Sequence, residues 1–273
     1  MTTQGPDPTD STDGRAKIVV RGVSKIFYQK KQGREVRAIE DLNFSVSEGE
    51  YLVIVGETGA GKSAFFDCLL GLKELTSGEI LIDGTSCWEF RRSNVGKITR
   101  IFQEDRLLPW RTASENVCLG LEIQGVPEEK RREIAHRWLK AVGLWGFENS
   151  YPNELSGGMR QRVNIARAFA TQPEILLLDE AFGGLDEVTA TRLRKDFLNL
   201  AYQQNMTFLM VTHSIEEALI LGRRILVFGV PAHVVHEIHV PEGIEENASL
   251  LEEKQAEIKY WIAKEGRLKS AVE

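Results

Sequence analysis

The chain has 273 residues, of which 42% are hydrophobic and 27% charged, and its formal net charge is −6. Such a composition is typical of a globular protein, and the length suffices for one large or two modest domains. An acidic chain lacks the basic face on which most nucleic-acid-binding proteins depend, so we expect no nucleic-acid partner. No apolar run approaches the ~18 residues needed to span a bilayer. Any membrane role is therefore expected to be peripheral, through a partner.

The three cysteines, Cys68, Cys87 and Cys118, form no C-x-x-C pair and have no zinc-like spacing to histidine. Their odd number argues against a disulfide framework. We interpret them as reduced, packed thiols of a cytosolic protein. The acidic, polar N-terminus also lacks the basic and apolar regions of a signal peptide.

The first part of the chain reads as a tail followed by strands. Residues 1–15, rich in Pro, Gly, Asp, Ser and Thr, are predicted to be a disordered tail. Strand character begins near Lys17, and residues 30–34 (KKQGR) are typical of a hairpin tip. Residues 38–46 alternate as a half-buried strand does. The continuous apolar run 51–55 (YLVIV) is typical of a parallel strand covered on both faces.

The remaining pattern alternates helices and strands, which predicts a parallel sheet with right-handed crossovers. A middle block, about residues 105–160, is expected to be a helical insertion because residues 126–142 carry apolar side chains at helical spacing. The other predicted helices are 62–72, 159–170, 187–203 and 248–271. The other predicted strands are 78–82, 98–102, 175–178, 208–211, 224–228 and 233–238, with a turn at Asp83-Gly84.

Residues 56–63 (GETGAGKS) fit the pattern G-x-x-x-x-G-K-S/T between a predicted strand and a predicted helix. Glycines let the backbone turn tightly and aim its N–H groups at phosphate, and the helix N-terminus behind them favours an anion. Lys62 would reach the β- and γ-phosphates, and the Ser63 hydroxyl would coordinate Mg²⁺. The alternative is a glycine-rich turn that binds nothing, but its position between strand and helix favours ATP. The predicted contacts are Gly56, Glu57, Thr58, Gly59, Ala60, Gly61, Lys62 and Ser63.

The run 175–180 (ILLLDE) ends a predicted strand with two acids. Ligands of open α/β sheets lie at the carboxyl ends of strands, so Asp179 is expected to hold Mg²⁺. Glu180 is the candidate to orient and deprotonate the attacking water. The alternative is a pair of solvated acids, which the phosphate loop makes less favourable.

Residues 155–158 (LSGG) form a second polar, glycine-rich turn before a predicted helix. Such a turn is a second anion site. Two anion sites with a helical block between them are hard to explain with one nucleotide in a closed monomer.

With this motif the chain resembles the ABC ATPase family, whose signature is LSGG. The resemblance covers about residues 17–240 and implies an α/β fold: a P-loop NTPase (RecA-like) core with a parallel sheet, an antiparallel β subdomain and a helical subdomain at about 105–160. It implies an ATPase domain over 16–240 and a helical extension over 241–273. It also implies a dimer that sandwiches two ATP molecules, so that Ser156, Gly157 and Gly158 contact the γ-phosphate bound to the partner.

Further positions match the family by resemblance. Gln103 corresponds to the glutamine that touches Mg²⁺ and relays to the membrane subunits, and His213 to the histidine that contacts the γ-phosphate. Phe27 lies where the family stacks an aromatic ring on adenine, and Tyr28 is an alternative. The resemblance thus implies catalytic roles for Lys62, Glu180 and His213, and metal-binding roles for Ser63, Gln103 and Asp179.

The chain departs from the common family pattern at four positions, Met159, Ala181, Gly184 and Ser214. None removes a group expected to touch phosphate or metal. Gly184 begins the segment Gly184-Leu185-Asp186, which crosses the dimer in the family, and it would make that segment more flexible.

The segments 107–110 (LLPW), 115–117 (ENV) and 155–162 (LSGGMRQR) resemble the nitrate/sulfonate/taurine branch of bacterial importers. This branch implies import of a small anionic or organic-acid solute, a permease that docks near Gln103–Trp110, and a solute-binding protein. It also implies a place on the cytoplasmic face of the inner membrane. Leu107, Leu108 and Trp110 would form the docking surface, and the alternative for them is ordinary packing under a loop.

Three other functions are less favourable. A soluble ABC protein of DNA repair or translation would carry two cassettes or a long coiled-coil insertion, and this sequence shows neither. A GTPase would carry an N-K-x-D element, which is absent, and LSGG has no place in a kinase or GTPase. A degenerate regulatory cassette would have lost some of Lys62, Asp179, Glu180 and His213. The sequence does not specify the cargo or whether the partner cassette is identical.

Overall fold

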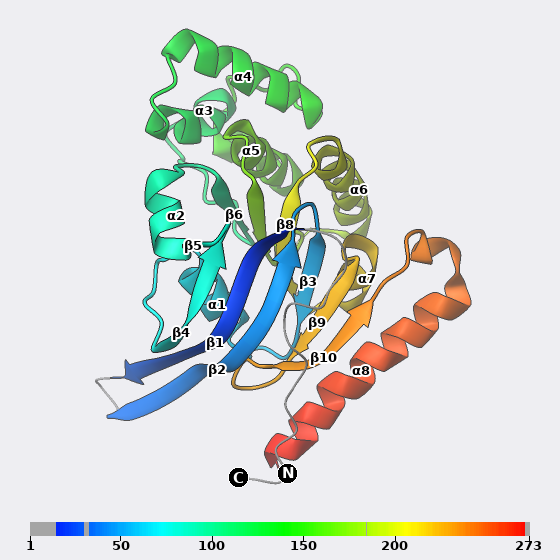
Figure 1. Cartoon of the computed structure of the whole chain (residues 1–273). Helices are drawn as coiled ribbons and strands as arrows, with labels where there is room; N and C mark the ends of the chain where they lie inside the picture. Colours follow the sequence, from blue (N-terminus) through cyan, green and yellow to red (C-terminus); the bar gives the residue numbers. More distant parts are fainter. Residues whose placement is uncertain (1–14, 30–32, 184, 271–273) are drawn as a thin grey trace. The chain divides into compact units, whose positions relative to one another are not determined.

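The computed structural model describes residues 15–29, 33–183 and 185–270, with side chains for all of these except 29 and 267–270. The chain divides into two compact units. The first combines residues 1–90 with 211–273, and the second comprises residues 91–210. Figure 1 labels the helices and strands used below.

An antiparallel sheet in the first unit has the strand order β2-β1-β4-β5. Its strands are β1 (Ala16–Gln29), β2 (Arg34–Ser47), β4 (Ser77–Ile82) and β5 (Thr85–Ser86). Asp83 and Gly84, with φ of 50° and 78°, join β4 to β5 in the two-residue turn that suits a twisted hairpin. The fully buried Ile18, Val20 and Val23 of β1 supply its apolar face.

The first unit also contains three strands of the larger sheet: β3 (Tyr51–Val55), β9 (Arg224–Phe228) and β10 (Val234–His239). β3 runs parallel to β9, and β10 is antiparallel to β9. In β3 and β9 four of the five residues are buried, as expected for strands covered on both faces. The helices of this unit are α1 (Lys62–Leu69), α7 (Ile215–Leu221), the short η2 (Ile244–Glu246) and α8 (Ala248–Ser270).

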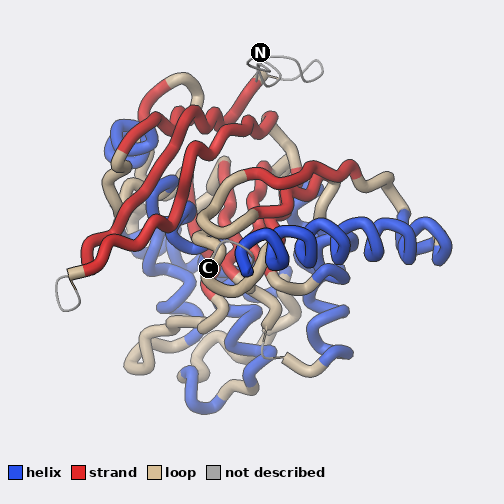
Figure 2. The backbone as a smooth tube through the Cα atoms, turned by 90° about the horizontal axis from the view of Figure 1, so that it is seen from below, coloured by secondary structure: helices blue, strands red, loops and turns tan. Residues whose placement is uncertain are grey.

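The C-terminal helix α8 belongs to this first unit, where it contacts α7, β9 and β10. Figure 2 shows it as a long helix alongside these strands. The Trp261 ring stacks on His236 of β10 at a centroid distance of 4.3 Å, and His236 Nε2 lies 3.1 Å from Glu257 Oε1. The extension expected over residues 241–273 is therefore packed on strands and a helix of the first unit as far as it is described.

The second unit combines strands with a layer of helices. β7 (Ile175–Asp179) lies between β6 (Ile98–Phe102) and β8 (Thr207–Thr212). β6 and β7 are parallel. The last two residues of β8 belong to the first unit. Its helices are α3 (Ala113–Ile123), α4 (Glu128–Ala141), the short η1 (Pro152–Glu154), α5 (Gly157–Ala170) and α6 (Glu187–Gln203), and α2 (Cys87–Ser93) crosses the boundary. α3, α4 and α5 contact one another, and the expected helical subdomain lies within this unit.

The predicted elements compare closely with these bounds. Strands 51–55, 98–102 and 224–228 and helix 187–203 begin and end where they were predicted. α1 ends at Leu69 rather than at residue 72, because the chain turns at Gly71 with φ +60°. Six short or weakly periodic elements were not predicted individually: β5, α2, α3, α7, η1 and η2. The predicted tail, apart from residue 15, and the tip residues 30–32 lie outside the described residues.

The part of the chain that the structure describes contains no helix long and apolar enough to cross a membrane.

Phe197 of α6 lies at the centre of the apolar core of the second unit. Its ring centroid is 5.5–5.8 Å from three other rings, those of Phe169, Phe182 and Phe208.

We predict that Phe197→Ala lowers the free energy of unfolding by about 3–5 kcal/mol, because it removes a fully buried ring and leaves a cavity. Tyr202→Ala on the same helix is the control, since Tyr202 is 79% exposed. Urea unfolding followed by circular dichroism measures both. Equal effects of the two substitutions would contradict this packing.

Candidate functional site

The glycine-rich loop joins the end of β3 to the start of α1 in the first unit. A Cβ added at Gly56 would lie 2.7 Å from Phe228 O, and one added at Gly61 would lie 2.1 Å from Ala38 O. Gly59 and Gly61 have φ of 86° and 78°. Glycine is therefore required at Gly56 and Gly61 because the backbones on both sides approach too closely for a side chain.

The N-terminus of α1 has the features of an anion site. Its N-cap is Gly61 in the left-handed conformation, no side chain caps it, and its first turn carries no acid. Thr58 and Ser63 are exposed beside it. The positive end of the helix dipole is thus available to a bound phosphate.

Lys62 lies folded over this loop. Its ammonium donates to Gly56 O at 2.6 Å and to Glu57 O at 2.8 Å, and the residue is 6% exposed. A cation held by the loop's own carbonyls is already located where the phosphates of a nucleotide would lie.

His213 and Phe27 are the other predicted site residues of the first unit. His213 is exposed and follows the end of β8. In the same turn, Thr212 Oγ1 donates to Glu217 Oε2 at 2.8 Å. Ser214 caps α7 by accepting a hydrogen bond from Glu217 N. Ser214 is therefore the N-cap of α7, a position at which serine is preferred. Phe27 is half-buried on β1, with the Lys25 ammonium 5.0 Å from its ring centroid, and Tyr28 is exposed.

The two acids of the second unit lie at the carboxyl end of β7. The Asp179 carboxylate accepts a hydrogen bond from Arg100 Nη2 of the neighbouring strand β6. Glu180 has φ +49°, in the left-handed region that non-glycine residues rarely occupy, and its carbonyl accepts from Gly183 N at 3.0 Å. A non-glycine residue with such a backbone is a feature that clusters at functional sites.

The signature turn precedes α5. Ser156 is the N-cap of this helix and accepts from Met159 N at 3.3 Å, Ser156 and Gly157 are exposed, and the first turn carries no acid. A Cβ on Gly158 would lie 2.8 Å from Thr189 Cγ2, so this glycine is required for packing. The positive end of this second helix, capped by Ser156, is exposed, so another molecule can reach it.

A hollow of about 620 Å³ in the second unit brings three predicted regions together. Its lining contains Gln103, Gly157 of the signature turn and Gly183 of the loop after Glu180. A Cβ added at Gly183 would lie 3.2 Å from Gln103 Nε2, so the glutamine amide lies directly beside that loop.

A polar network that the sequence reasoning missed links these regions. The Gln161 amide, 4% exposed, donates to Ala181 O at 2.5 Å, immediately after Glu180. Asn164 donates to Gln161, and Arg167 donates to Asn164 and to the carbonyls of Asp105 and Arg106. Burial lowers the pKa of Arg167, and the nearby Asp105 opposes this shift. Buried polar residues at i, i+3 and i+6 of one helix were the available sequence signal.

The loop from 105 to 112 is fastened by Asn116, which is fully buried. Its side chain accepts from Leu108 N at 2.8 Å and donates to the carbonyls of Leu108, Arg111 and Thr112. Ordinary packing accounts for Leu107, which is 8% exposed, whereas Trp110 is 69% exposed. The second unit also has an apolar groove of about 230 Å³, lined by Val95, Leu119, Ile123 and Ala168 among others.

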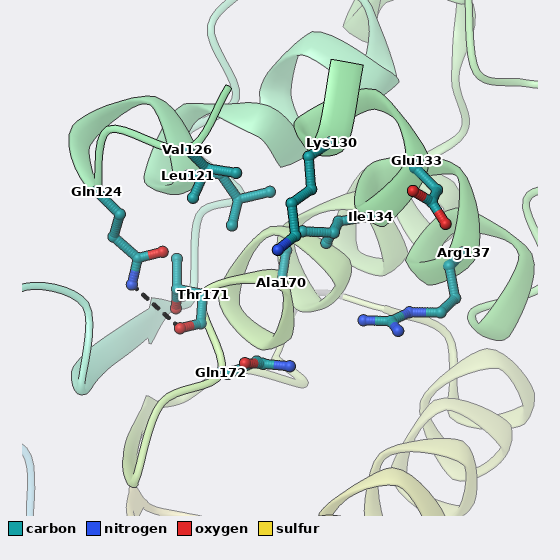
Figure 3. Close-up of a pocket in the computed structure, with 10 residues that line it drawn as sticks. All are labelled: Leu121, Gln124, Val126, Lys130, Glu133, Ile134, Arg137, Ala170, Thr171 and Gln172. Atoms are coloured by element: carbon teal, nitrogen blue, oxygen red, sulfur yellow. Dashed lines mark hydrogen bonds between the residues drawn. The ribbon is translucent and has the colours of Figure 1, made fainter. Parts of the chain in front are cut away.

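Another hollow of this unit, about 330 Å³ in volume, contains none of the predicted site residues (Figure 3). Lys130 and Arg137 of α4 reach over it, and Gln124, the C-cap of α3, donates to Thr171 O at 3.2 Å. Thr171 is the C-cap of α5. Two cations and the C-caps of two helices thus share the lining of this hollow.

The donors predicted for Mg²⁺ fit that ion chemically. A carboxylate, a hydroxyl and an amide oxygen are hard ligands, and Mg²⁺ is usually held by one or two carboxylates together with substrate phosphates and water. Ser63 and Gln103 are exposed, and the Asp179 side chain is 15% exposed. In the described ranges, no group of three or more His, Cys, Asp or Glu side chains could hold a metal by itself.

Comparison with known proteins agrees with this description. A family model described as ABC transporter matches residues 39–183. The aliphatic sulfonates import ATP-binding protein SsuB of Bacillus cereus is 39% identical over 221 residues, which are 81% of this chain and 84% of that protein. The taurine import ATP-binding protein TauB of Rhizobium johnstonii is 40% identical over 213 residues, 78% of this chain and 80% of that protein.

A similar solved structure is the dimeric, post-hydrolysis state of the ATP-binding cassette MJ0796 bound to ADP and Pi. The two structures superpose with a TM-score of 0.73, and their sequences are 32% identical. The superposed region covers 82% of this chain and 99% of the MJ0796 chain. This likeness confirms the expected α/β fold, in which strands of a partly parallel sheet are combined with an antiparallel sheet and a group of helices.

We predict that Gly61→Ala abolishes nucleotide binding and lowers the melting temperature more than Gly59→Ala does. Both positions have positive φ, which costs about 1–3 kcal/mol for alanine. Only at Gly61 would the added Cβ also collide with a backbone oxygen, since nothing lies within 4 Å of one added at Gly59. Thermal unfolding and binding of a fluorescent ATP analogue test this, and a Gly61 variant as stable as the Gly59 variant would contradict the loop geometry.

Proposed function

This chain belongs to the ABC transporter family of ATP-hydrolysing proteins, and from that premise we propose that it drives import of a small organic anion. The single observation that carries the proposal is the presence of two helix N-termini with no acidic residue in the first turn, at Gly61 and Ser156, together with the acidic end of β7. A triphosphate needs the first two, and its hydrolysis needs the third.

In the proposed reaction, each catalytic group has one task. Backbone N–H groups of residues 56–63 bind the phosphates, and Lys62 leaves the loop carbonyls to pair with the β- and γ-phosphates. Glu180 orients and deprotonates the attacking water, and His213 contacts the γ-phosphate. Phe27, or the exposed Tyr28, stacks on adenine.

Ser63, Gln103 and Asp179 are the proposed Mg²⁺ donors. A bound Mg²⁺ neutralises charge on the β- and γ-phosphates during transfer. Asp179 is suited to this role because it lies at the carboxyl end of a buried strand, where ligands of open α/β sheets bind.

Hydrolysis is proposed to require two copies. Ser156 and Gly157 are exposed at the N-terminus of α5, so the γ-phosphate bound to the second copy has access to them. Two copies would close over two ATP molecules and separate after hydrolysis. Asp186, whose pKa is lowered by hydrogen bonds from Thr189, stays charged in the segment expected to cross this interface.

The membrane partner is proposed to be a permease that docks on the second unit. The apolar groove at Val95 and Ile123 and the exposed Trp110 supply apolar surface for a permease helix. The network Gln161–Asn164–Arg167 then carries movement of the Glu180 loop to the backbone of Asp105 and Arg106, next to that surface.

The cargo is proposed to be a small sulfonate or a related organic anion, delivered by a solute-binding protein. The names of the relatives support this class, since one imports aliphatic sulfonates and the other taurine. The chain would then work at the cytoplasmic face of the membrane. A DNA-repair or translation function is not favoured by these relatives.

We expect Glu180→Gln to keep ATP binding while turnover falls about 10²–10⁴-fold, the usual contribution of a general base. The loss arises because an amide cannot accept the proton of water. Released phosphate and analytical ultracentrifugation with ATP measure turnover and dimer formation. Glu187→Gln is the matched control, since Glu187 is a neighbouring carboxylate with no proposed role. Hydrolysis at the normal rate in Glu180→Gln would remove this residue from its role.

We expect Ile123→Asp to weaken co-purification with the permease and to lower transport, because it places a charge in the apolar groove. Ile123 is 69% exposed, so ATP binding and folding should be unchanged. Tyr202→Asp, at an exposed position of α6, is the control. Unaltered permease capture by Ile123→Asp would rule out the groove as the docking surface.

A further inference from the structure

A buried arginine touches the carboxylate proposed to hold the metal. Arg100 lies on β6 opposite Leu177 of β7, two pairs before Phe102 and Asp179. Since alternate residues share a face, Arg100 and Asp179 point to the same side of these parallel strands. Arg100 Nη2 donates to Asp179 Oδ2, and the two side chains are only 8% and 15% exposed.

The guanidinium of Arg100 is held in place at this strand end. It lies 4.5 Å from the Phe102 ring centroid, and Arg106 lies 3.8 Å from the same centroid. An aromatic face attracts such cations, most strongly where water is excluded. Two positive charges are therefore fixed around one ring, beside the strand end from which Gln103 follows.

This placement opposes metal binding electrostatically. A carboxylate that already accepts a charged hydrogen bond has one oxygen occupied and its charge largely neutralised. Mg²⁺ at the same carboxylate would face a positive charge at close range, and water screens this repulsion poorly because both side chains are mostly buried.

We propose that Arg100 is an internal counter-ion of Asp179 and competes with Mg²⁺ for its carboxylate. This rests on the proposed function, since it takes Asp179 as a metal donor. In the absence of metal, the arginine supplies a counter-charge to this mostly buried carboxylate. The metal–nucleotide complex binds only when Arg100 gives up, or shares, its hydrogen bond. Arg100 thus sets the metal concentration at which the site fills.

The alternative is a structural ion pair that orients Asp179 for the metal. The two hypotheses predict opposite changes in metal affinity when the charge of Arg100 is removed. If Arg100 competes, removing its charge strengthens metal binding; if it orients the carboxylate, removing it weakens metal binding.

The test measures the affinity of the full-length chain for Mn²⁺ in the presence of a non-hydrolysable ATP analogue. Mn²⁺ replaces Mg²⁺ because its binding can be followed by EPR. Arg100→Gln removes the charge and keeps a hydrogen-bond donor, whereas Arg100→Met removes both. Arg100→Lys keeps the charge. Arg162→Gln is the matched control, because Arg162 pairs with Asp196 at 2.7 Å and its side chain is 15% exposed.

The expected result is Mn²⁺ binding about tenfold tighter in Arg100→Gln and Arg100→Met, a typical effect of removing one nearby charge. Arg100→Lys and Arg162→Gln should stay near the original affinity. With a chelator present, Arg100→Gln should bind the ATP analogue no more tightly than the original chain. Circular dichroism verifies folding, and if Arg100→Met does not fold, Arg100→Gln alone decides the result.

Unchanged or weaker Mn²⁺ binding by folded Arg100→Gln would overturn this inference and leave the proposed function intact. If the original chain with the analogue bound no Mn²⁺, the proposed role of Asp179 would fail, and the inference would fail with it.

Discussion

Attraction between phosphate oxygens and the positive N-terminal ends of two helices is the interaction on which this account depends. Neither α1 nor α5 has an acidic residue in its first turn, and their N-caps are Gly61 and Ser156. The glycines are needed for a physical reason, because a Cβ at Gly56 or Gly61 would collide with a neighbouring backbone oxygen. Close backbone approach is also what lets several N–H groups converge on one anion.

The loop that follows β7 is connected to the rest of the second unit by hydrogen bonds as well as by apolar packing. Gln161 binds the carbonyl that follows Glu180, and Arg167 binds the carbonyls of Asp105 and Arg106. Both belong to α5, the helix that begins at the signature turn. One helix therefore carries the proposed second phosphate site at its start and contacts to two loops along its length. A movement of the helix or of either loop therefore displaces the groups that are hydrogen-bonded to it.

Much of the fold follows from local patterns. The buried runs 51–55 and 224–228 were predictable as strands because strands covered on both faces are continuously apolar. α3 was missed because Asn116, Cys118 and Gly120 interrupt its apolar pattern. Its capping box, Thr112 with Glu115, was nevertheless visible in the sequence and marks where the helix begins.

The positions of the glycine-rich loop and of the acidic strand end were predictable because the proposed chemistry requires fixed residue types at fixed spacing. The pairing of Arg100 with Asp179 was not, since these residues are far apart in sequence and only the register of β6 on β7 brings them together. The same holds for Gln161 and Ala181. Long-range polar contacts depend on tertiary structure, which no local pattern contains.

The central claim, that each ATP is held by the loop of one copy and the signature turn of another, has a direct test by mixing two inactive variants. Lys62→Ala removes the loop lysine and Ser156→Arg blocks the signature turn, so each variant alone should be inactive. Mixed dimers contain one intact site, and random pairing should restore about a quarter of the original ATPase rate. A mixture as inactive as its two components would contradict the shared site.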